Sequence, residues 1–283
     1  MKETRAEYLP ISKLHPFEGH PFKVADNEEM EQLTWSILTQ GLLTPLVVRP
    51  LPNDKYEVIS GHRRLHACKK AGIETVPALI TDMDRDAAAI ALVDSNLHRE
   101  HILPSEKAFA YKLKLEAMNR QGQRTDLTST QVVSKLRTNE MVGEAGGDSR
   151  ETVRRYIRLT NLLPSILEKV DEGRIALTPA VELSYLTEDE QKNLLETMES
   201  EDCTPSLSQA IQMKQLSQAG KLNMDTIFGI LTQPKANQRE KISFRADEVR
   251  KFFPRNYTPA QMQKVIFILL GEYQRMRQRT QVR

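Results

Sequence analysis

Apolar residues near the start of the chain repeat at helical spacing. Residues 27–40 carry apolar side chains three and four positions apart, so they predict an amphipathic helix that ends at Gly41. The predicted apolar face of this helix consists of Met30, Leu33, Ile37 and Leu38. A second amphipathic helix is predicted from Asp84 onward.

The segments around these helices have the alternation and the turn residues of strands. Short strands are predicted at residues 8–11, 46–48, 56–59 and 76–80. The middle two form a hairpin around the Pro-Asn-Asp turn at 52–54. The first hundred residues therefore predict an α+β domain.

A basic helix begins directly after the strand at 56–59. Gly61 ends the strand, and His62, Arg63 and Arg64 form the first turn of the helix. Amides at a helix N-terminus attract anions, and two arginines there are unfavourable for the helix dipole unless an anion offsets them. The spacing alone leaves two interpretations open, a phosphate site and a structural turn.

The rest of the chain shows mainly helical periodicity. A helix is predicted to begin at Pro104 or Ser105 and to end before Gly122, followed by a polar loop at 121–128. Further helices are predicted at 129–136, 165–172, 179–186, 187–198, 206–220, 225–232 and 259–276. Residues 233–239 are the predicted linker. The last helix has a broad apolar face, which must pack against something.

Residues 148–162 form the most informative of these helices. Asp148 or Ser149 can cap its first turn, and Glu151 completes the D-x-x-E form of a capping box. One face carries Val153, Tyr156, Ile157 and Thr160, and another face carries Arg150, Arg154 and Arg158, with Arg155 nearby. The helix therefore has one side suited to a core and one suited to an anion.

A short helix containing Met141, Val142 and Ala145 precedes it, and Gly146-Gly147 separates the two. Two short helices joined by a glycine-containing turn are the helix-turn-helix pattern, although packed helices of other all-α folds share it. In a helix-turn-helix the start of the second helix reads base edges. Candidate DNA-contacting residues are thus Arg150, Thr152 and Arg154 for bases, Arg155 and Arg158 for phosphates, and Ser149 at the cap.

Composition narrows the class of protein. The 283 residues are 39% hydrophobic and 28% charged, with a net charge of only +2, so polyanion binding must come from local clusters. Two distant cysteines argue against a disulfide framework and favour the cytoplasm. No apolar run predicts a membrane span. Four histidines, at positions 62, 66, 98 and 101, lack the spacing of a metal site and are expected to be ordinary surface or phosphate-contacting residues.

The order of these motifs resembles a known family. The run T-x-G-L-L-T-P-L-V-V-R, then I-S-G-H-R-R-L, V-P-A and S-N-L-H-R-E, resembles the N-terminal domain of ParB-type partition proteins, whose fold is shared with sulfiredoxin. The run RRYIRLTNLLPSILEKVDEGRIALTPAVELSYL resembles the family's helix-turn-helix domain. Together they cover residues 6–190 and look closest to the ParB-like proteins of plasmids and conjugative elements.

The resemblance implies a CTP-binding site in the N-terminal domain. Gly41, Thr44 and Pro45 are then expected near the nucleobase. Gly61, His62, Arg63, Arg64, Asn96 and Arg99 are expected around the phosphates, with Mg²⁺ as an accompanying ion. Arginine forks and helix-terminal amides suit a triphosphate.

Two positions depart from the family pattern. The family commonly has G-E-R-R and E-N-x-x-R, whereas this chain has His62 and Ser95 at the acidic positions. Those glutamates are associated with magnesium and water handling, so the chain is expected to be at most a weak CTP hydrolase and mainly a DNA-binding protein. A sulfiredoxin-like enzyme is rejected, because Ser60 stands where a reactive cysteine would be needed and Cys68 lies well inside the helix.

The expected architecture has four parts. They are an α+β ParB/sulfiredoxin-like nucleotide-binding domain at 1–100, an all-α helix-turn-helix domain at 101–200, a helical linker region at 201–239 and a helical C-terminal domain at 240–283 for dimerisation. The expected protein is a cytoplasmic, nucleoid-associated homodimer that binds a centromere-like site on double-stranded DNA and works with a ParA-type ATPase. The alternatives are a ParB-like transcriptional regulator without a partition role and a ParB-fold nucleotide hydrolase or nuclease.

Overall fold

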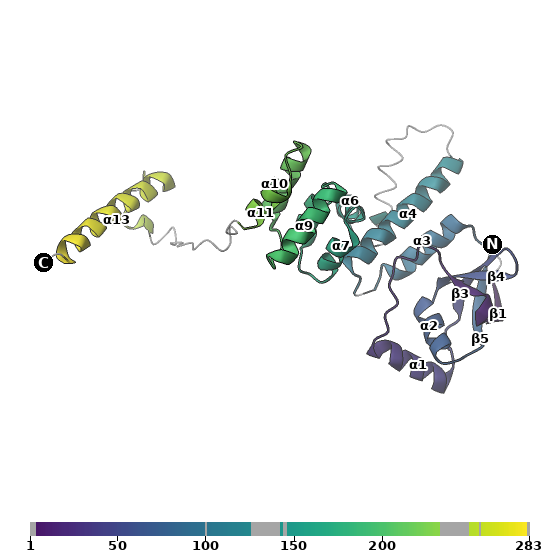
Figure 1. Cartoon of the computed structure of the whole chain (residues 1–283). Helices are drawn as coiled ribbons and strands as arrows, with labels where there is room; N and C mark the ends of the chain where they lie inside the picture. The colour runs from purple at the N-terminus through teal and green to yellow at the C-terminus, as the bar shows by residue number, and fades with distance from the viewer. Residues whose placement is uncertain are drawn as a thin grey trace. The chain divides into compact units, whose positions relative to one another are not determined.

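The computed structural model describes residues 4–99, 101–125, 142–143, 146–232, 249–254 and 256–281. The chain divides into two compact units, Met1–Gln233 and Pro234–Arg283 (Figure 1). The predicted helix at 129–136, the predicted linker at 233–239 and most of the short helix before Gly146 lie outside the described residues.

A five-stranded mixed sheet forms the N-terminal part of the first unit. Its strands are β1 (Thr4–Pro10), β2 (Leu14–Pro16), β3 (Leu46–Leu51), β4 (Lys55–Ser60) and β5 (Thr75–Thr81). Their order is β1-β5-β3-β4-β2, with β1–β5 and β3–β4 antiparallel and β3–β5 and β2–β4 parallel. The predicted hairpin is confirmed, and its turn uses Asn53 and Asp54 at positive φ, which their short polar side chains tolerate.

Helices α1 (Glu28–Gln40) and α2 (His62–Lys70) pack against the sheet. Their buried residues form one core with the strands, made of Met30, Ile37, Leu46, Val48, Val58, Leu65, Ala67, Cys68, Val76 and Ala78 among others. Asn27 caps α1 by accepting from the Met30 amide, and Gly41 ends it at a φ of 75°. The predicted helix at 27–40 is therefore confirmed.

The predicted apolar face of α1 is wrong at one position, Leu38. Leu38 is 60% exposed, as is its neighbour Trp35 at 68%, whereas Met30 and Ile37 are buried. Leu38 follows Ile37 by one position, which turns it about 100° around a helix of 3.6 residues per turn and away from the core.

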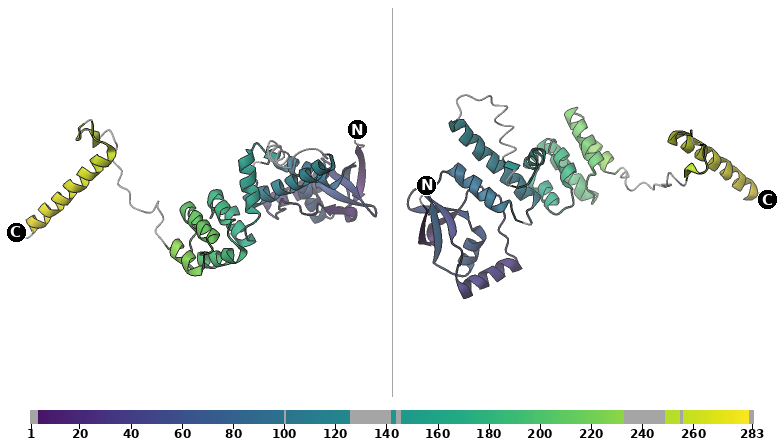
Figure 2. Two further views of the ribbon diagram at one scale, coloured as in Figure 1. Left: turned by 90° about the horizontal axis from the view of Figure 1, so that it is seen from above. Right: turned by 180° about the vertical axis from the view of Figure 1, so that it is seen from behind.

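The helical part of the first unit begins with two long neighbours. They are α3 (Arg85–Asn96), capped by Asp84, and α4 (Pro104–Thr125), and both views show them side by side (Figure 2). The predicted end of α4 before Gly122 is wrong, because the helix continues to Thr125. The predicted loop is therefore wrong at residues 121–125, and its residues 126–128 lie outside the described ranges. A single glycine costs a helix only about 1 kcal/mol, too little to end it.

The remaining helices of this unit are α6 (Arg150–Leu159), α7 (Pro164–Asp171), α8 (Leu177–Leu183), α9 (Glu188–Ser200), α10 (Leu207–Gln218) and α11 (Met224–Leu231). A core of their apolar residues joins α6 to α11. A second core joins Ile59 of β4, Leu92 of α3, Tyr111 of α4 and Val153 of α6. The sheet and the helices of this unit thus share packing.

The second unit contains α13 (Pro259–Gln281). Of the predicted apolar face, Met262 is buried, Val265 and Ile266 are half-buried, and Leu269, Leu270 and Tyr273 are exposed. Phe267, Ile268 and Met276 are exposed as well. Among the described residues, much of the face that was predicted to pack is therefore exposed. Across the described residues, α13 and the other helices are too short or too polar to cross a membrane.

Candidate functional site

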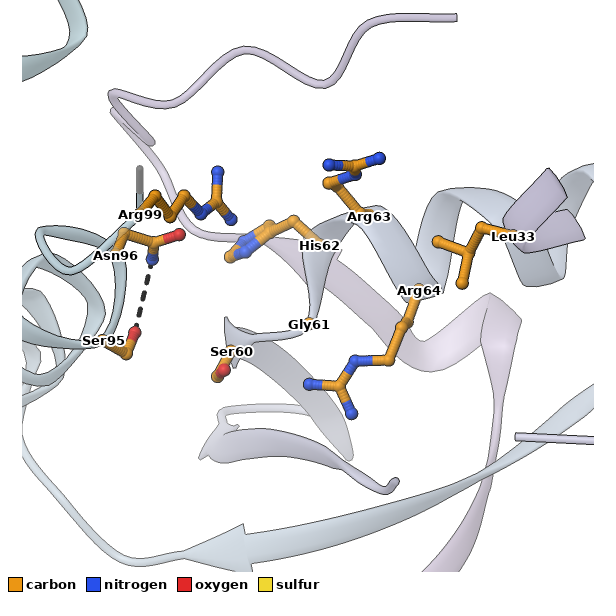
Figure 3. Close-up of a pocket in the computed structure, with 9 residues that line it drawn as sticks. All are labelled: Leu33, Ser60, Gly61, His62, Arg63, Arg64, Ser95, Asn96 and Arg99. Carbon is orange, nitrogen blue, oxygen red and sulfur yellow. Dashed lines mark hydrogen bonds between the residues drawn. The ribbon is translucent and has the colours of Figure 1, made fainter. Parts of the chain in front are cut away.

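A cavity of about 240 Å³ lies where α1, α2 and the end of α3 meet. Nine residues from three separate segments line it, as Figure 3 shows: Leu33, Ser60, Gly61, His62, Arg63, Arg64, Ser95, Asn96 and Arg99. Six of the nine nucleotide-site residues predicted from the sequence are among them. The site is therefore assembled by tertiary structure from parts about 30 residues apart along the chain.

Gly61 makes the turn between β4 and α2. Its φ of 101° is a conformation that side chains disfavour, and an added Cβ would lie 2.6 Å from the Leu46 Cδ2 atom. The turn leaves α2 without a side-chain cap at its N-terminus. Its first amides and the positive end of its dipole are therefore available to a ligand beside His62 and Arg63.

Three arginines surround the cavity and are held in different ways. The Arg64 Nη1 atom donates to the carbonyl oxygens of Thr44 at 2.5 Å and Pro45 at 2.8 Å. The Arg63 Nη2 atom donates to Glu29 at 3.0 Å, and the Arg99 guanidinium lies 5.4 Å from the centre of the Phe22 ring. Burial lowers the pKa of both Arg64 and Arg99, so an anion in the cavity would offset a cost of desolvation.

His62 is a neutral member of this cationic set. Its ring centre lies 3.8 Å from that of His20, and its Nε2 atom accepts from the Phe17 amide at 3.4 Å. Burial, together with the charge effects of His20 and Arg99, lowers the pKa of His62 from 6.5 to about 3. Burial also lowers the pKa of His20, whose Nδ1 atom lies 2.7 Å from the Phe22 carbonyl oxygen.

The end of α3 supplies the opposite wall. The Asn96 amide nitrogen donates to the Leu92 carbonyl oxygen at 2.7 Å and to the Ser95 hydroxyl at 3.3 Å. The helix ends at Asn96, and a turn in which the Arg99 amide donates to the Asn96 carbonyl oxygen brings Arg99 to the cavity. Arg99 therefore reaches the site from a turn and not from the helix itself.

The structure separates the predicted nucleobase residues from the phosphate residues. Gly41 is exposed at the end of α1 and does not line the cavity. Thr44 and Pro45 do not line the cavity either, but their carbonyl oxygens accept hydrogen bonds from Arg64, which does. Sequence reasoning predicts no binding role for Ser60 and assigns Leu33 to the core, and spacing offers no signal that either residue lines the cavity.

The cavity fits a polyphosphate and does not fit a protein-held magnesium ion. Arginines, an amide and helix-terminal amides are the donors that phosphate oxygens accept from. Magnesium prefers carboxylate oxygens, and none of the nine lining residues carries one. Over the described ranges, no three histidine, cysteine, aspartate or glutamate residues gather as they would around a metal.

A second basic site lies on α6. The Ser149 hydroxyl accepts from the Thr152 amide at 3.2 Å and is the N-cap of this helix. The predicted D-x-x-E box at Asp148 is wrong, because its carboxylate accepts from the Tyr111 hydroxyl and from the Lys107 Nζ atom at 2.6 Å instead. Asp148 thus fastens the start of α6 to α4.

Two glycines let this attachment form. A Cβ on Gly143 would lie 2.2 Å from the Asp148 carbonyl oxygen, and one on Gly146 would lie 2.5 Å from the Tyr111 hydroxyl. Gly147 has a φ of 69° and completes the turn. The close approach of the turn to α4 therefore depends on residues without side chains at these positions.

The arginines of α6 divide into two groups. Arg155 donates to the Thr178 hydroxyl at 2.6 Å, and Arg158 donates to Ser184 and stacks 3.8 Å from the Tyr185 ring centre. These contacts attach the helix to α8 and the segment after it. Arg150 is partly exposed and Arg154 fully so, at the start of α6 where base-reading residues are expected.

Two family models match the chain. The ParB N-terminal domain matches residues 1–97 and the ParB HTH domain matches residues 128–220. A probable chromosome-partitioning protein ParB from Vibrio cholerae is 30% identical over 262 residues, which covers 86% of this chain and 83% of that protein. A nucleoid occlusion protein from Bacillus thuringiensis is 31% identical, with 77% of this chain and 75% of that protein covered.

Other relatives extend beyond the matched region. The match to the probable chromosome-partitioning protein ParB of Pseudomonas putida is 32% identical and covers 67% of this chain, which spans only 60% of that relative's length. Among solved structures, a C-terminally truncated chromosome-partitioning protein ParB from Caulobacter crescentus complexed with CTP-gamma-S is 24% identical, with a TM-score of 0.32, and the match covers 66% of this chain and 96% of that one. The two domain matches in sequence order, together with the long match to the Vibrio cholerae protein, show that the chain belongs to the ParB family of partition proteins.

Proposed function

We propose that this chain binds a centromere-like DNA site through α6 and binds CTP in the cavity beside α2, and that it serves the segregation or maintenance of a DNA element. The observation that carries the DNA half is the start of α6. There Arg150, Thr152 and Arg154 follow a capped turn that Asp148 fastens to α4. A rigid helix with arginines at its N-terminal end is what base reading in the major groove requires.

Arg155 and Arg158 have a different part in this proposal. Their hydrogen bonds to Thr178 and Ser184 orient α6 against its neighbours. Arg155 is half-buried and can still contact a DNA phosphate. Arg158 acts mainly by holding the helix in place through its stacking on Tyr185.

The nucleotide half rests on the cavity. Arg63, Arg64 and Arg99 supply positive charge on several sides, and the first amides of α2 supply aligned donors. The cavity of about 240 Å³ is smaller than most sites for whole small molecules, which suits the phosphates more than the base. The base would then lie outside it, toward Thr44 and Gly41. CTP is the nucleotide to test first, since the relative from Caulobacter crescentus was solved with CTP-gamma-S.

A homodimer and a ParA-type ATPase partner complete the proposal. The uncovered apolar residues of α13 supply a surface for a second copy of the chain. A regulator without a partition partner is the second candidate, because relatives of similar identity include nucleoid occlusion proteins. Stimulation of a co-purified ATPase by this protein separates the two candidates.

The DNA proposal is tested by sequencing the fragments that the protein retains from its host DNA, with and without CTP. One enriched short motif supports it, and retention proportional to fragment length, with no motif, contradicts it. The same experiment shows whether the enriched sites lie on a chromosome or on a mobile element.

The CTP proposal is tested with Arg63→Ala. We expect CTP affinity, measured by calorimetry, to fall about tenfold or more, since a hydrogen bond to a charged group contributes about 1.5–3 kcal/mol. Arg85→Ala is the matched control, because Arg85 is similarly exposed, pairs with Glu18 and does not line the cavity. Equal affinity of the Arg63 variant and wild type removes the phosphate assignment.

A further inference from the structure

The charge around the cavity is one-sided. Arg63, Arg64 and Arg99 line it, together with the amide of Asn96 and the hydroxyls of Ser60 and Ser95, and no lining residue is acidic. A nucleoside triphosphate usually arrives with magnesium, which proteins hold through one or two carboxylates. In this site the positive charges of the protein take the place that such an ion would fill.

The two carboxylates that interact with these arginines, those of Glu29 and Glu106, already have ion-pair or hydrogen-bond partners. Glu29 forms an ion pair with Arg63 at 3.0 Å. The two oxygens of Glu106 accept from the backbone amides of Lys23 at 2.7 Å and Leu103 at 3.1 Å. Glu106 is also buried, so turning it toward the cavity would leave two amides without their acceptor.

His62 does not substitute for a carboxylate. It faces the His20 ring, accepts from the Phe17 amide and stands beside Arg99. The guanidinium of Arg99 repels a cation there, and the neutral His62 ring supplies no carboxylate oxygen. A phosphate oxygen at the same place would meet donors and positive charge from several sides.

We propose that this cavity binds the nucleoside triphosphate as an uncomplexed polyphosphate anion, neutralised by its arginines and not by a protein-held magnesium ion. The inference rests on the proposed nucleotide binding and defines the ionic form of its ligand. Magnesium in solution then competes with the arginines for the same phosphate oxygens. Binding therefore does not require magnesium and is not strengthened by it.

The test is calorimetric binding of CTP to the full chain in EDTA and in excess magnesium chloride. We expect the affinity in EDTA to equal or exceed that in magnesium. An affinity at least tenfold weaker in EDTA overturns the inference and leaves the proposed CTP binding intact. Absence of CTP binding in both buffers overturns the proposed nucleotide binding itself.

Two double variants test whether the missing carboxylates set the response of CTP binding to magnesium. His62→Glu with Ser95→Glu places two carboxylates at the cavity, and we expect this variant to bind CTP at least tenfold more weakly in EDTA than in magnesium. His62→Gln with Ser95→Gln matches it in size without charge and is expected to keep the wild-type response to magnesium. If the acidic pair also binds equally in both buffers, the missing carboxylates do not set the metal response and the inference fails. Should the acidic variant not fold, the wild-type comparison decides alone.

Discussion

The cavity and α6 are both basic, but they use their arginines in opposite ways. The cavity gathers Arg63 and Arg64 from one helix and Arg99 from a turn, and each guanidinium is held in place by hydrogen bonds or a ring. The arginines of α6 come from one continuous helix, with Arg150 and Arg154 on its outer side and Arg158 turned toward Tyr185. The cavity can enclose an anion, whereas α6 can present side chains to one.

The difference also appears in how each site is supported. α6 depends on Asp148, Tyr111 and Lys107, which attach it to α4. The cavity depends on Gly61, which allows α2 to begin next to Leu46. The two sites are linked by the core that joins Ile59 of β4 to α3, α4 and α6. The following experiments are arranged by expected effect and test how far the sites differ.

The largest expected effect comes from Asp148→Ala. Removing this carboxylate leaves the buried Tyr111 hydroxyl and the mostly buried Lys107 without their partner, so we expect the free energy of unfolding to fall by about 3 kcal/mol. Chemical denaturation measures it. Asp189→Ala, at a side chain 93% exposed, is the control and should change stability little. A loss below about 1 kcal/mol would show that α6 is not fastened through this residue.

The next largest effect is expected from Arg150→Ala, which tests sequence-specific DNA binding and not protein stability. Loss of a base contact costs about 1–3 kcal/mol, so affinity for the retained motif should fall about 5- to 150-fold while affinity for unrelated DNA changes little. Fluorescence anisotropy with both DNAs measures this. Arg174→Ala, on an exposed arginine of the same helical region that pairs with Asp202, is the matched control. An equal loss on both DNAs would assign Arg150 to phosphates instead.

Lowering the pH should lower the free energy of unfolding through His62, which lines the cavity. The unfolded chain protonates His62 near pH 6.5, while the folded chain does so only near its pKa of about 3. Between pH 7 and pH 5 the unfolded state therefore binds more protons, and His62 alone should lower stability by about 2 kcal/mol. Denaturation of wild type and His62→Gln at both pH values tests it, since the variant should show a flatter dependence. Identical slopes would mean that His62 titrates normally.

The smallest expected effect is that of Leu38→Gln. Leu38 is 60% exposed, so exchanging it for another good helix former should change stability by less than about 0.5 kcal/mol. Ile37→Ala on the adjacent buried position should cost about 3 kcal/mol by the same denaturation assay. Similar costs for both would show that Leu38 is covered in solution.

The sequence by itself determined the elements and the motifs. The order of strands and helices, the glycine that ends α1, the glycine before His62 and the arginine spacing of α6 are local features, and a chain reports its local preferences directly. The family membership followed from the same short runs. Local features also mislead in places, because Gly122 does not end α4 and Leu38 does not lie in the core.

Only the tertiary structure decided which residues meet. It brought Ser95, Asn96 and Arg99 to α2, exchanged the capping role of Asp148 for contacts with Tyr111 and Lys107, and turned Arg158 onto Tyr185. These are contacts between residues about 25 to 40 positions apart, and their formation depends on how whole elements pack. Spacing along one helix or strand carries no information about a partner on another element. The sequence alone could therefore report the missing acids at His62 and Ser95, but only the fold showed that no other lining residue supplies a carboxylate.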